Sequence, residues 1–205
     1  MESKIIHFDK SQINEANHLL GRAFYNDPAY TYIILEEGNR RERLVGWLCT
    51  LTVRYGLAFG HVYTTDNSLK GVAIWIPSDA FSLSFIPMIK IGMYVLPFQL
   101  GFSAVKRVIK LLNNIEKHHK LNMPEKHWYL SLLGVDPVYQ NQGIGSSLLQ
   151  PILKQADVEG LPCYLETFTE KNVRFYHKHG FAVVTEVNIS KSNLRFWTMK
   201  RKPQN

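Results

Sequence analysis

Hydrophobic and polar positions along the chain follow two spacings, one typical of strands and one typical of helices. Strand-length apolar runs occur at 61–65 and 71–76, on either side of an Asp-Asn-Ser turn, and predict a hairpin. Apolar residues three or four positions apart predict helices at 40–57 and 103–120. Taken in order, the segments predict β-α-α-β-β-α-α-β-α-β-α-β-β, which favours a mixed sheet with helices on both faces.

The segment 29–37 is predicted to be a loop joining two early helices. A short strand at 4–8 comes first, and Asp9 or Ser11 is suited to cap the helix that follows it. That helix is predicted to give way around 26–28, at Asn-Asp-Pro. The loop therefore carries a group of aromatic and acidic side chains between two helices.

The stretch 128–149, WYLSLLGVDPVYQNQGIGSSLL, is the centre of the predicted fold. Its apolar first third predicts a central strand, which Asp136-Pro137 ends because proline cannot donate to a ladder. Gly143 and Gly145 then precede an apolar helical stripe, and a helix N-terminus suits a phosphate. Neither a Lys-Ser/Thr pair nor a full G-x-G-x-x-G is present. On these residues alone, a phosphate cradle and a simple turn that starts a helix are both open.

Composition and charge narrow the classes of partner. A chain of 205 residues predicts a single domain, 1–205, with a helical insertion at 81–120. The net charge of +7 suits an anionic ligand. The basic residues are scattered rather than clustered, so we expect no nucleic acid. The chain has no apolar stretch of 18 uncharged residues, so we expect no membrane partner.

The cysteine and histidine positions indicate a reducing compartment and no metal. Cys49 and Cys163 both sit in apolar runs, where a free cysteine is a small core residue. No disulfide framework is expected, and the first residues lack the apolar stretch of a signal peptide, which predicts a cytoplasmic location. His118 and His119 suit either metal or acid–base work or a solvated helix end. The solvated helix end is favoured because no third ligand accompanies them.

Two sequence motifs resemble one known family. The strand followed by Val135-Asp136-Pro137 and Gln140-x-x-Gly143-x-Gly145 resembles the coenzyme A-binding motif of the GNAT superfamily of N-acetyltransferases. The stretch Asn172–Phe181, with Tyr176 before Gly-Phe, resembles the second half of that signature. The sequence is also similar to puromycin N-acetyltransferase-like members, through the stretches 22–28, 72–75, 128–137, 165–167, 172–181 and 195–199.

The resemblance implies an α/β (α+β mixed) GNAT fold. Its central mixed, mostly antiparallel sheet has about seven strands, with helices on both faces, and is splayed at the fourth and fifth strands. The helical segment 81–120 is then expected to cover the acceptor site. We expect a monomer or a homodimer.

The resemblance also implies direct transfer of an acetyl group from acetyl-CoA to an amine. Tyr176 is the expected acid for the departing thiolate, and Glu166, on the strand facing the motif strand, is the candidate base. The implied cofactor-binding residues are Leu133, Gly134, Val135, Gln140, Asn141, Gln142, Gly143, Ile144, Gly145, Ser146, Asn172 and Tyr176. Weaker candidates for the acceptor site are Tyr30, Tyr32, Glu36 and His127.

Each role has a structural alternative. Tyr176 and the tyrosines of the acceptor site suit core packing, Asn172 suits a helix cap, and Glu166 suits an ion pair. Three functions remain open at this point: an N-acetyltransferase of a small-molecule or aminoacyl-type amine, a protein lysine or N-terminal acetyltransferase, and a non-catalytic coenzyme A-binding module.

Overall fold

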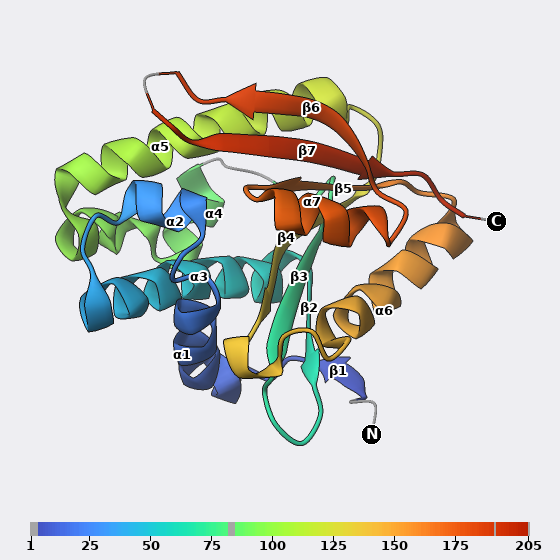
Figure 1. Cartoon of the computed structure of the whole chain (residues 1–205), viewed down its shortest axis with the longest axis horizontal. Coiled ribbons are helices and arrows are strands. Elements are labelled where there is room, and N and C mark those ends of the chain that lie inside the picture. Colours follow the sequence, from blue (N-terminus) through green and yellow to red (C-terminus); the bar gives the residue numbers. More distant parts are fainter. Residues whose placement is uncertain (1–3, 82–84, 191, 205) are drawn as a thin grey trace.

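The computed structural model describes residues 4–81, 85–190 and 192–204, and it is built on one seven-stranded sheet (Figure 1). The strand order is β1-β2-β3-β4-β5-β7-β6, and within these described ranges only the β4–β5 pair is parallel. The chain therefore has the expected mixed, mostly antiparallel sheet. The strands are β1 (Ile5–His7), β2 (His61–Thr65), β3 (Gly71–Pro77), β4 (Trp128–Val135), β5 (Cys163–Thr167), β6 (Ala182–Asn188) and β7 (Arg195–Arg201).

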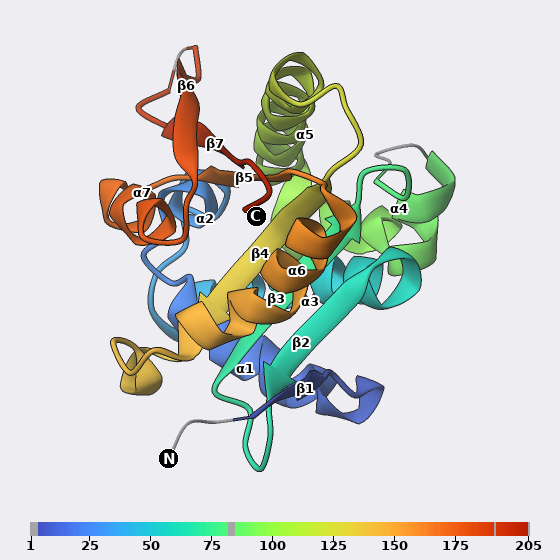
Figure 2. The same cartoon turned by 90° about the vertical axis from the view of Figure 1, so that its right-hand side faces the viewer.

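Helices cover both faces of the sheet, as Figure 2 shows for α6 on one side of β2–β4 and α1 and α3 on the other. Each face has its own cluster of buried apolar side chains. The helices are α1 (Ile13–Ala23), α2 (Pro28–Ile33), α3 (Gly38–Phe59), α4 (Phe85–Ile91), α5 (Leu96–Asn122), α6 (Ile144–Glu159) and α7 (Glu170–His177), with 3-10 turns at Lys10–Gln12, Met93–Val95 and Pro137–Tyr139.

The prediction of a loop at 29–37 is wrong for its first part. Asp27 is the N-cap of α2, its carboxylate accepts the Ala29 N–H at 2.9 Å, and Pro28 occupies the first turn. Proline has a pre-set φ that suits the first helical position, and aspartate is a favoured cap. The Asp-Pro pair ends one helix and begins the next, and the sequence interpretation used only the first of these properties.

The predicted insertion, 81–120, forms α4, a 3-10 turn and α5. The expected helix 103–120 begins earlier, at Leu96, with a break at Gly101, whose φ of 75° and ψ of 160° are not helical. Residues 82–84 lie outside the described part of the chain. The designation of this segment as an insertion within a single domain stays a prediction.

The sheet opens between β4 and β5. The two strands pair only where residues 128–130 face 163–165, whereas β3 pairs with β4 along its whole length. Beyond Leu130 the edge of β4 that faces β5 carries no strand partner. The fourth and fifth strands are therefore splayed, as expected, and the backbone of residues 131–135 borders the opening.

The helices α1 and α3 approach each other closely enough to exclude side chains at their crossing. A Cβ added at Gly46 would lie 2.2 Å from the backbone oxygen of Asn17, and one added at Gly21 would lie 2.5 Å from that of Glu42. These contacts involve backbone atoms, which cannot rotate away. The two glycines therefore set the spacing of the helix pair that covers one face of the sheet.

We predict that Gly46→Ala lowers the free energy of unfolding by about 1–3 kcal/mol, because an added methyl overpacks the helix crossing. The matched control is Arg43→Ala on the exposed side of α3, which we expect to change stability by less than about 0.5 kcal/mol. Urea unfolding of both variants measures the difference. Equal stability of Gly46→Ala and the control would contradict the close-packing account.

Candidate active site

The glycine-rich loop ends at the N-terminus of α6, which no side chain of the described residues caps. Gly143 is the N-cap of α6 with φ of 80°, and no side chain caps the first turn. An added Cβ at Gly143 would meet nothing within 4 Å, so the space beside the first turn is open. The first N–H groups of a helix have no partner within the helix, and they attract anions. The loop therefore fits a pyrophosphate group.

Other residues of the loop fix its shape. The side-chain amides of Gln140 and Gln142 donate to the carbonyls of Val135 and Val138, at 3.1 and 3.2 Å. Asn141 adopts a left-handed φ of 61°, which asparagine tolerates better than most residues. Gln140 thus ties the loop to the end of β4, and Gln142 ties it to the 3-10 turn Pro137–Tyr139.

A histidine that the sequence interpretation did not single out lies beside this loop. His179 Nε2 is 3.0 Å from the Ser146 hydroxyl, in the first turn of α6. Burial, together with the charges of Arg201 and Lys178, lowers the pKa of His179. Its distance of 33 residues from Ser146 in the sequence gave no local signal for this contact.

The end of β4 carries three of the expected cofactor residues. An added Cβ at Gly134 would lie 2.6 Å from Leu20 and 2.8 Å from Phe24, so this glycine lets α1 pack against the strand. Leu133 and Val135 flank it on the splayed part of β4. A strand edge without a partner can accept an extended ligand through its backbone, as in strand addition.

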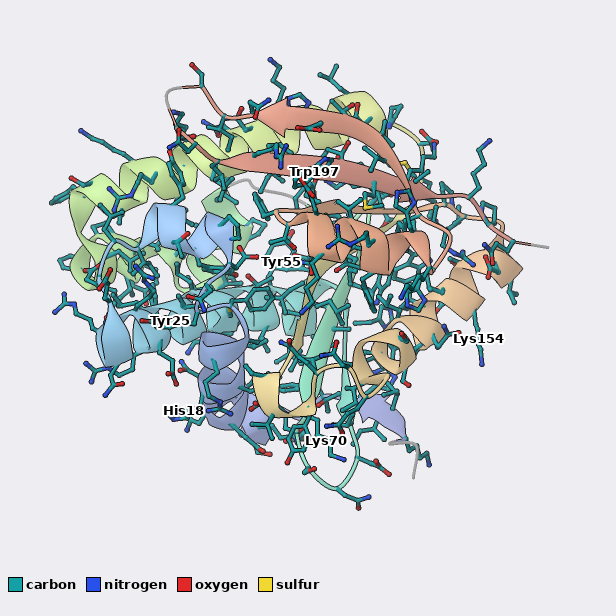
Figure 3. All side chains as sticks on the ribbon, viewed as in Figure 1. His18, Tyr25, Tyr55, Lys70, Lys154 and Trp197 are labelled. Carbon is teal, nitrogen blue, oxygen red and sulfur yellow. The ribbon has the colours of Figure 1, made fainter. Side chains whose placement is uncertain are left out.

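A cavity of about 260 Å³ lies among α2, α3, α5, α7 and the splayed strands. The structure brings five of the expected site residues to its wall: Tyr30, Leu133, Glu166, Asn172 and Tyr176. Residues that the sequence interpretation did not assign to the site also line it, among them Asp27, Tyr55, Phe81, Tyr129 and Phe168. Figure 3 shows Tyr55 projecting into the interior of the molecule, whereas Lys154 lies at its outer edge.

Three weaker candidates for the acceptor site are not among the lining residues of this cavity. Tyr32 lies on α2 and packs, partly buried, against the core. Glu36 forms an ion pair with Arg40, at 3.6 Å, near the start of α3. His127 precedes β4 and is buried beneath the cavity wall. Whether such a side chain reaches the cavity depends on the direction in which its short segment faces. Residue type alone did not predict that direction.

Glu166 is a carboxyl in a largely apolar environment. Its Oε2 accepts the Tyr129 hydroxyl at 2.8 Å, while Oε1 is buried with no partner among the described residues. Burial raises the pKa of Glu166 to about 8, which outweighs the opposing effect of the Tyr129 hydrogen bond. No ion pair to Glu166 occurs among the described residues, so the structural alternative of an ion-pair carboxylate is not supported. An unpaired buried carboxylate oxygen is rare in folded proteins, and a catalytic role is one of its recognised explanations.

Tyr176 lies on α7, 7% exposed, and its side chain lines the cavity. Burial, followed by the negative charge of Asp27, raises the pKa of the Tyr176 hydroxyl well above its ordinary value. The hydroxyl therefore holds its proton at neutral pH and can donate it. Asn172 lies one turn earlier on the same helix. Its N–H donates to the Thr169 hydroxyl at 3.2 Å, so Thr169, and not Asn172, is the helix cap.

Asp27 is the second carboxyl in the cavity wall, and it was missed as a site residue. Burial raises its pKa to about 6, against the opposing hydrogen bonds from the Ala29 and Tyr30 N–H groups. Burial is the main cause of the raised pKa values of Tyr30 and Cys49, and the charge of Asp27 adds to it. The available signal was the Asp-Pro helix start, which places Asp27 at the N-terminus of α2 with its side chain turned back over the first turn.

The prediction that His119 lies at a solvated helix end is wrong. His119 is 5% exposed, and its Nε2 is 2.7 Å from His127 Nε2. Its ring also stacks on Tyr164, with centroids 4.5 Å apart. Burial, followed by the charge of His127, lowers the pKa of His119 to about 3, so it is neutral. The long-range packing of α5 under β4 and β5 buries this residue, which its place near a helix end did not reveal.

The comparisons agree with this architecture. The Acetyltransferase (GNAT) family model matches residues 101–181. An acetyltransferase structure from Corynebacterium glutamicum, described as histone acetyltransferase HPA2 and related acetyltransferase, superposes with a TM-score of 0.69 at 16% identity, over 100% of this chain and 98% of that chain. Arylalkylamine N-acetyltransferase 2 from Aedes aegypti superposes with a TM-score of 0.67 at 14% identity, over 100% of both chains. The fold is therefore the GNAT fold.

Two curated relatives match most of this chain. An uncharacterized N-acetyltransferase of Schizosaccharomyces pombe is 23% identical over 176 residues, which cover 83% of this chain and 71% of that protein. A probable serine/threonine-protein kinase of Dictyostelium discoideum is 26% identical over 193 residues, which cover 85% of this chain but only 20% of that protein. The family model and the yeast relative show that this chain is similar to GNAT acetyltransferases, and the structural neighbours share its fold.

None of the helices in the described ranges is both long enough and apolar enough to cross a membrane. Within the same ranges, no three or more His, Cys, Asp or Glu side chains are grouped so that they could hold a metal ion.

We predict that Gly143→Ala weakens coenzyme A binding, because a methyl group enters the open space at the first turn of α6. Gly160→Ala is the matched control. Gly160 caps the other end of α6 with φ of 65°, and its added Cβ also meets nothing within 4 Å. Both changes cost about 1 kcal/mol of backbone strain. Titration calorimetry with coenzyme A should show a Kd raised at least tenfold for Gly143→Ala only, and equal Kd values would contradict a phosphate site at this loop.

Proposed function

We propose that this protein transfers the acetyl group of acetyl-CoA directly to the primary amine of a small-molecule or aminoacyl-type acceptor. The observation that supports this most is a single cavity that unites a candidate base, Glu166, and a candidate acid, Tyr176. The splayed part of β4 borders the same cavity through Leu133. Base, acid and the expected donor strand therefore meet at one place.

The donor is proposed to lie along the free edge of β4. The backbone of Leu133, Gly134 and Val135 would pair with its extended arm, and the Val135 N–H would polarise the thioester carbonyl. The N–H groups of the loop from Asn141 to Ser146 would hold the pyrophosphate, with Asn172 as a further hydrogen-bonding partner. The uncapped first turn of α6 supports this assignment.

The reaction forms one C–N bond and breaks one C–S bond. An acceptor that enters as an ammonium ion gives one proton to Glu166, and the neutral amine then attacks the thioester carbonyl. As the C–S bond breaks, Tyr176 donates its proton to the departing thiolate. The acetylated nitrogen loses its remaining extra proton, which restores the tyrosine directly or through solvent. In total the amide, the free thiol and one proton leave.

The small size of the cavity, together with the helices around it, favours a small acceptor over a protein. Helices α2, α3 and α5 cover it, and its volume of about 260 Å³ is at the small end of ligand pockets. A protein lysine or N-terminal amine stays the second candidate, and a non-catalytic coenzyme A-binding module is disfavoured by the two titratable groups that face the cavity. The likeness to puromycin N-acetyltransferase, the cytoplasmic location and a monomeric or homodimeric state stay predictions.

The proposed function is tested by incubating the purified protein with acetyl-CoA and a panel of primary amines, with free-thiol release as the readout. We expect turnover with at least one amine and formation of the N-acetyl product. Absence of turnover with every amine, together with no binding of coenzyme A in calorimetry, would rule the proposal out.

We predict that Tyr176→Phe lowers kcat by about 100-fold or more, the usual contribution of a positioned acid. The Kd for coenzyme A should change by less than about twofold, since the ring and its packing remain. Tyr63→Phe is the matched control, since Tyr63 is not among the lining residues of the cavity, and it should keep its full rate. An unchanged kcat in Tyr176→Phe would remove the acid role.

We predict that kcat/KM rises with pH through a pKa of about 8, because Glu166 accepts a proton only when it is ionised. Glu166→Gln should lose this ascending limb and about 100-fold or more in kcat/KM. Glu36→Gln is the control, since Glu36 is not among the lining residues of the cavity, and its pH profile should match that of the wild type. If the limb persists in Glu166→Gln, another group is the base.

A further inference from the structure

The cavity wall is mostly apolar, and it carries two carboxyl groups and a few neutral polar side chains such as Thr52, Ser131 and Asn172. Its lining side chains are mostly aromatic or aliphatic, supplied by α2, α3, α5 and the ends of β4 and β5. Among the described lining residues there is no Lys, Arg or His. The ionisable carboxyls on the wall are Asp27 and Glu166. The cavity therefore presents negative charge within an apolar surface, with no cationic side chain to balance it.

Asp27 is suited to be the charged member of the pair. The pKa of Asp27 is about 6, so its carboxyl group is ionised at neutral pH. The pKa of Glu166 is about 8, so its carboxyl group stays largely protonated until a bound cation or a rise in pH favours loss of the proton. Asp27 and Tyr176 line the same cavity, and the charge of Asp27 adds to the effect of burial in raising the pKa of Tyr176. A cation bound to Asp27 would thus sit near the reacting groups.

The aromatic residues define what the rest of the acceptor can be. Phe81 packs edge-on against Tyr129, with centroids 4.9 Å apart, and Phe24 lies 5.4 Å from Tyr30. All four side chains line the cavity. Such a wall favours alkyl and aryl groups and supplies ring faces that attract an ammonium ion. The neutral polar side chains on the wall are fewer than the apolar ones, so a polyhydroxylated amine would leave some of its hydroxyl groups unpaired, at a cost in binding.

We propose that the acceptor is a primary amine with an apolar alkyl or aryl body, and that Asp27 is the counter-ion that binds its ammonium group. This proposal rests on the proposed function. An amino acid is a poor fit, because its carboxylate would enter a cavity that already holds Asp27 and lacks a cation among its described lining residues. The acceptor thus lies outside the amino acids and the amino sugars.

Two substrate series test the apolar body. Initial rates with acetyl-CoA are measured for propyl-, butyl-, pentyl- and hexylamine, and kcat/KM should rise by about two- to fourfold per methylene until the cavity is filled. Phenethylamine is compared with phenylalanine, glucosamine and a lysine-containing peptide, and its kcat/KM should exceed each of the others by about 100-fold. A flat alkylamine series, or a preference for phenylalanine or glucosamine, overturns the inference while leaving the proposed function intact. A preference for the lysine-containing peptide overturns both and supports the protein-acceptor alternative.

Asp27→Asn tests the counter-ion. Asparagine is as good a helix cap as aspartate, so α2 is expected to keep its start. The KM for phenethylamine should rise about 10- to 100-fold, the usual value of a charge-assisted hydrogen bond, with the coenzyme A Kd unchanged. Asp9→Asn, at the cap of the turn Lys10–Gln12, is the matched control and should leave the KM unchanged.

The outcomes separate the two levels of the account. An unchanged KM in Asp27→Asn removes the counter-ion role. Failure of every amine in the wild-type enzyme removes the proposed function and, with it, the acceptor class.

Discussion

The divergence of β4 from β5 is the constraint on which the site depends. Pairing stops at Leu130 and Leu165, and five residues of β4 run on beside β3 alone. Because the strands diverge, the end of β4 has a free edge. The cavity borders that same edge. Because Glu166 follows Leu165 on β5, the same divergence places this carboxyl at the cavity wall. One feature of the sheet thus sets the positions of the expected donor strand and the candidate base.

The second organising feature is that two carboxyl groups in one largely apolar cavity have different pKa values. Burial raises the pKa values of both, to about 6 for Asp27 and about 8 for Glu166. Asp27 is held lower because the first N–H groups of α2 donate to it. Two like groups with different pKa values can divide the tasks of binding a cation and accepting its proton. The helix start of α2 therefore contributes to the chemistry of the site as well as to the fold.

The sequence predicted the parts of the site that depend on local signals. The β4–loop–α6 unit and the stretch around Tyr176 are recognisable because turn chemistry and motif spacing are encoded in neighbouring residues. The positions of Asp27, His119 and His179 depend on contacts between distant segments, which spacing does not reveal. Tyr32 and Tyr30 show the same limit. They are two residues apart on a short helix, and only Tyr30 lines the cavity.

The most direct test of the central claim is a crystal structure of the protein with coenzyme A and phenethylamine. The account predicts that the pantetheine arm lies along residues 131–135 of β4, with the pyrophosphate at the first turn of α6. It also predicts that the thiol reaches the cavity near Tyr176 and that the amine lies between Asp27 and Glu166. Coenzyme A bound elsewhere on the protein, with the β4 edge and the cavity empty, would contradict it.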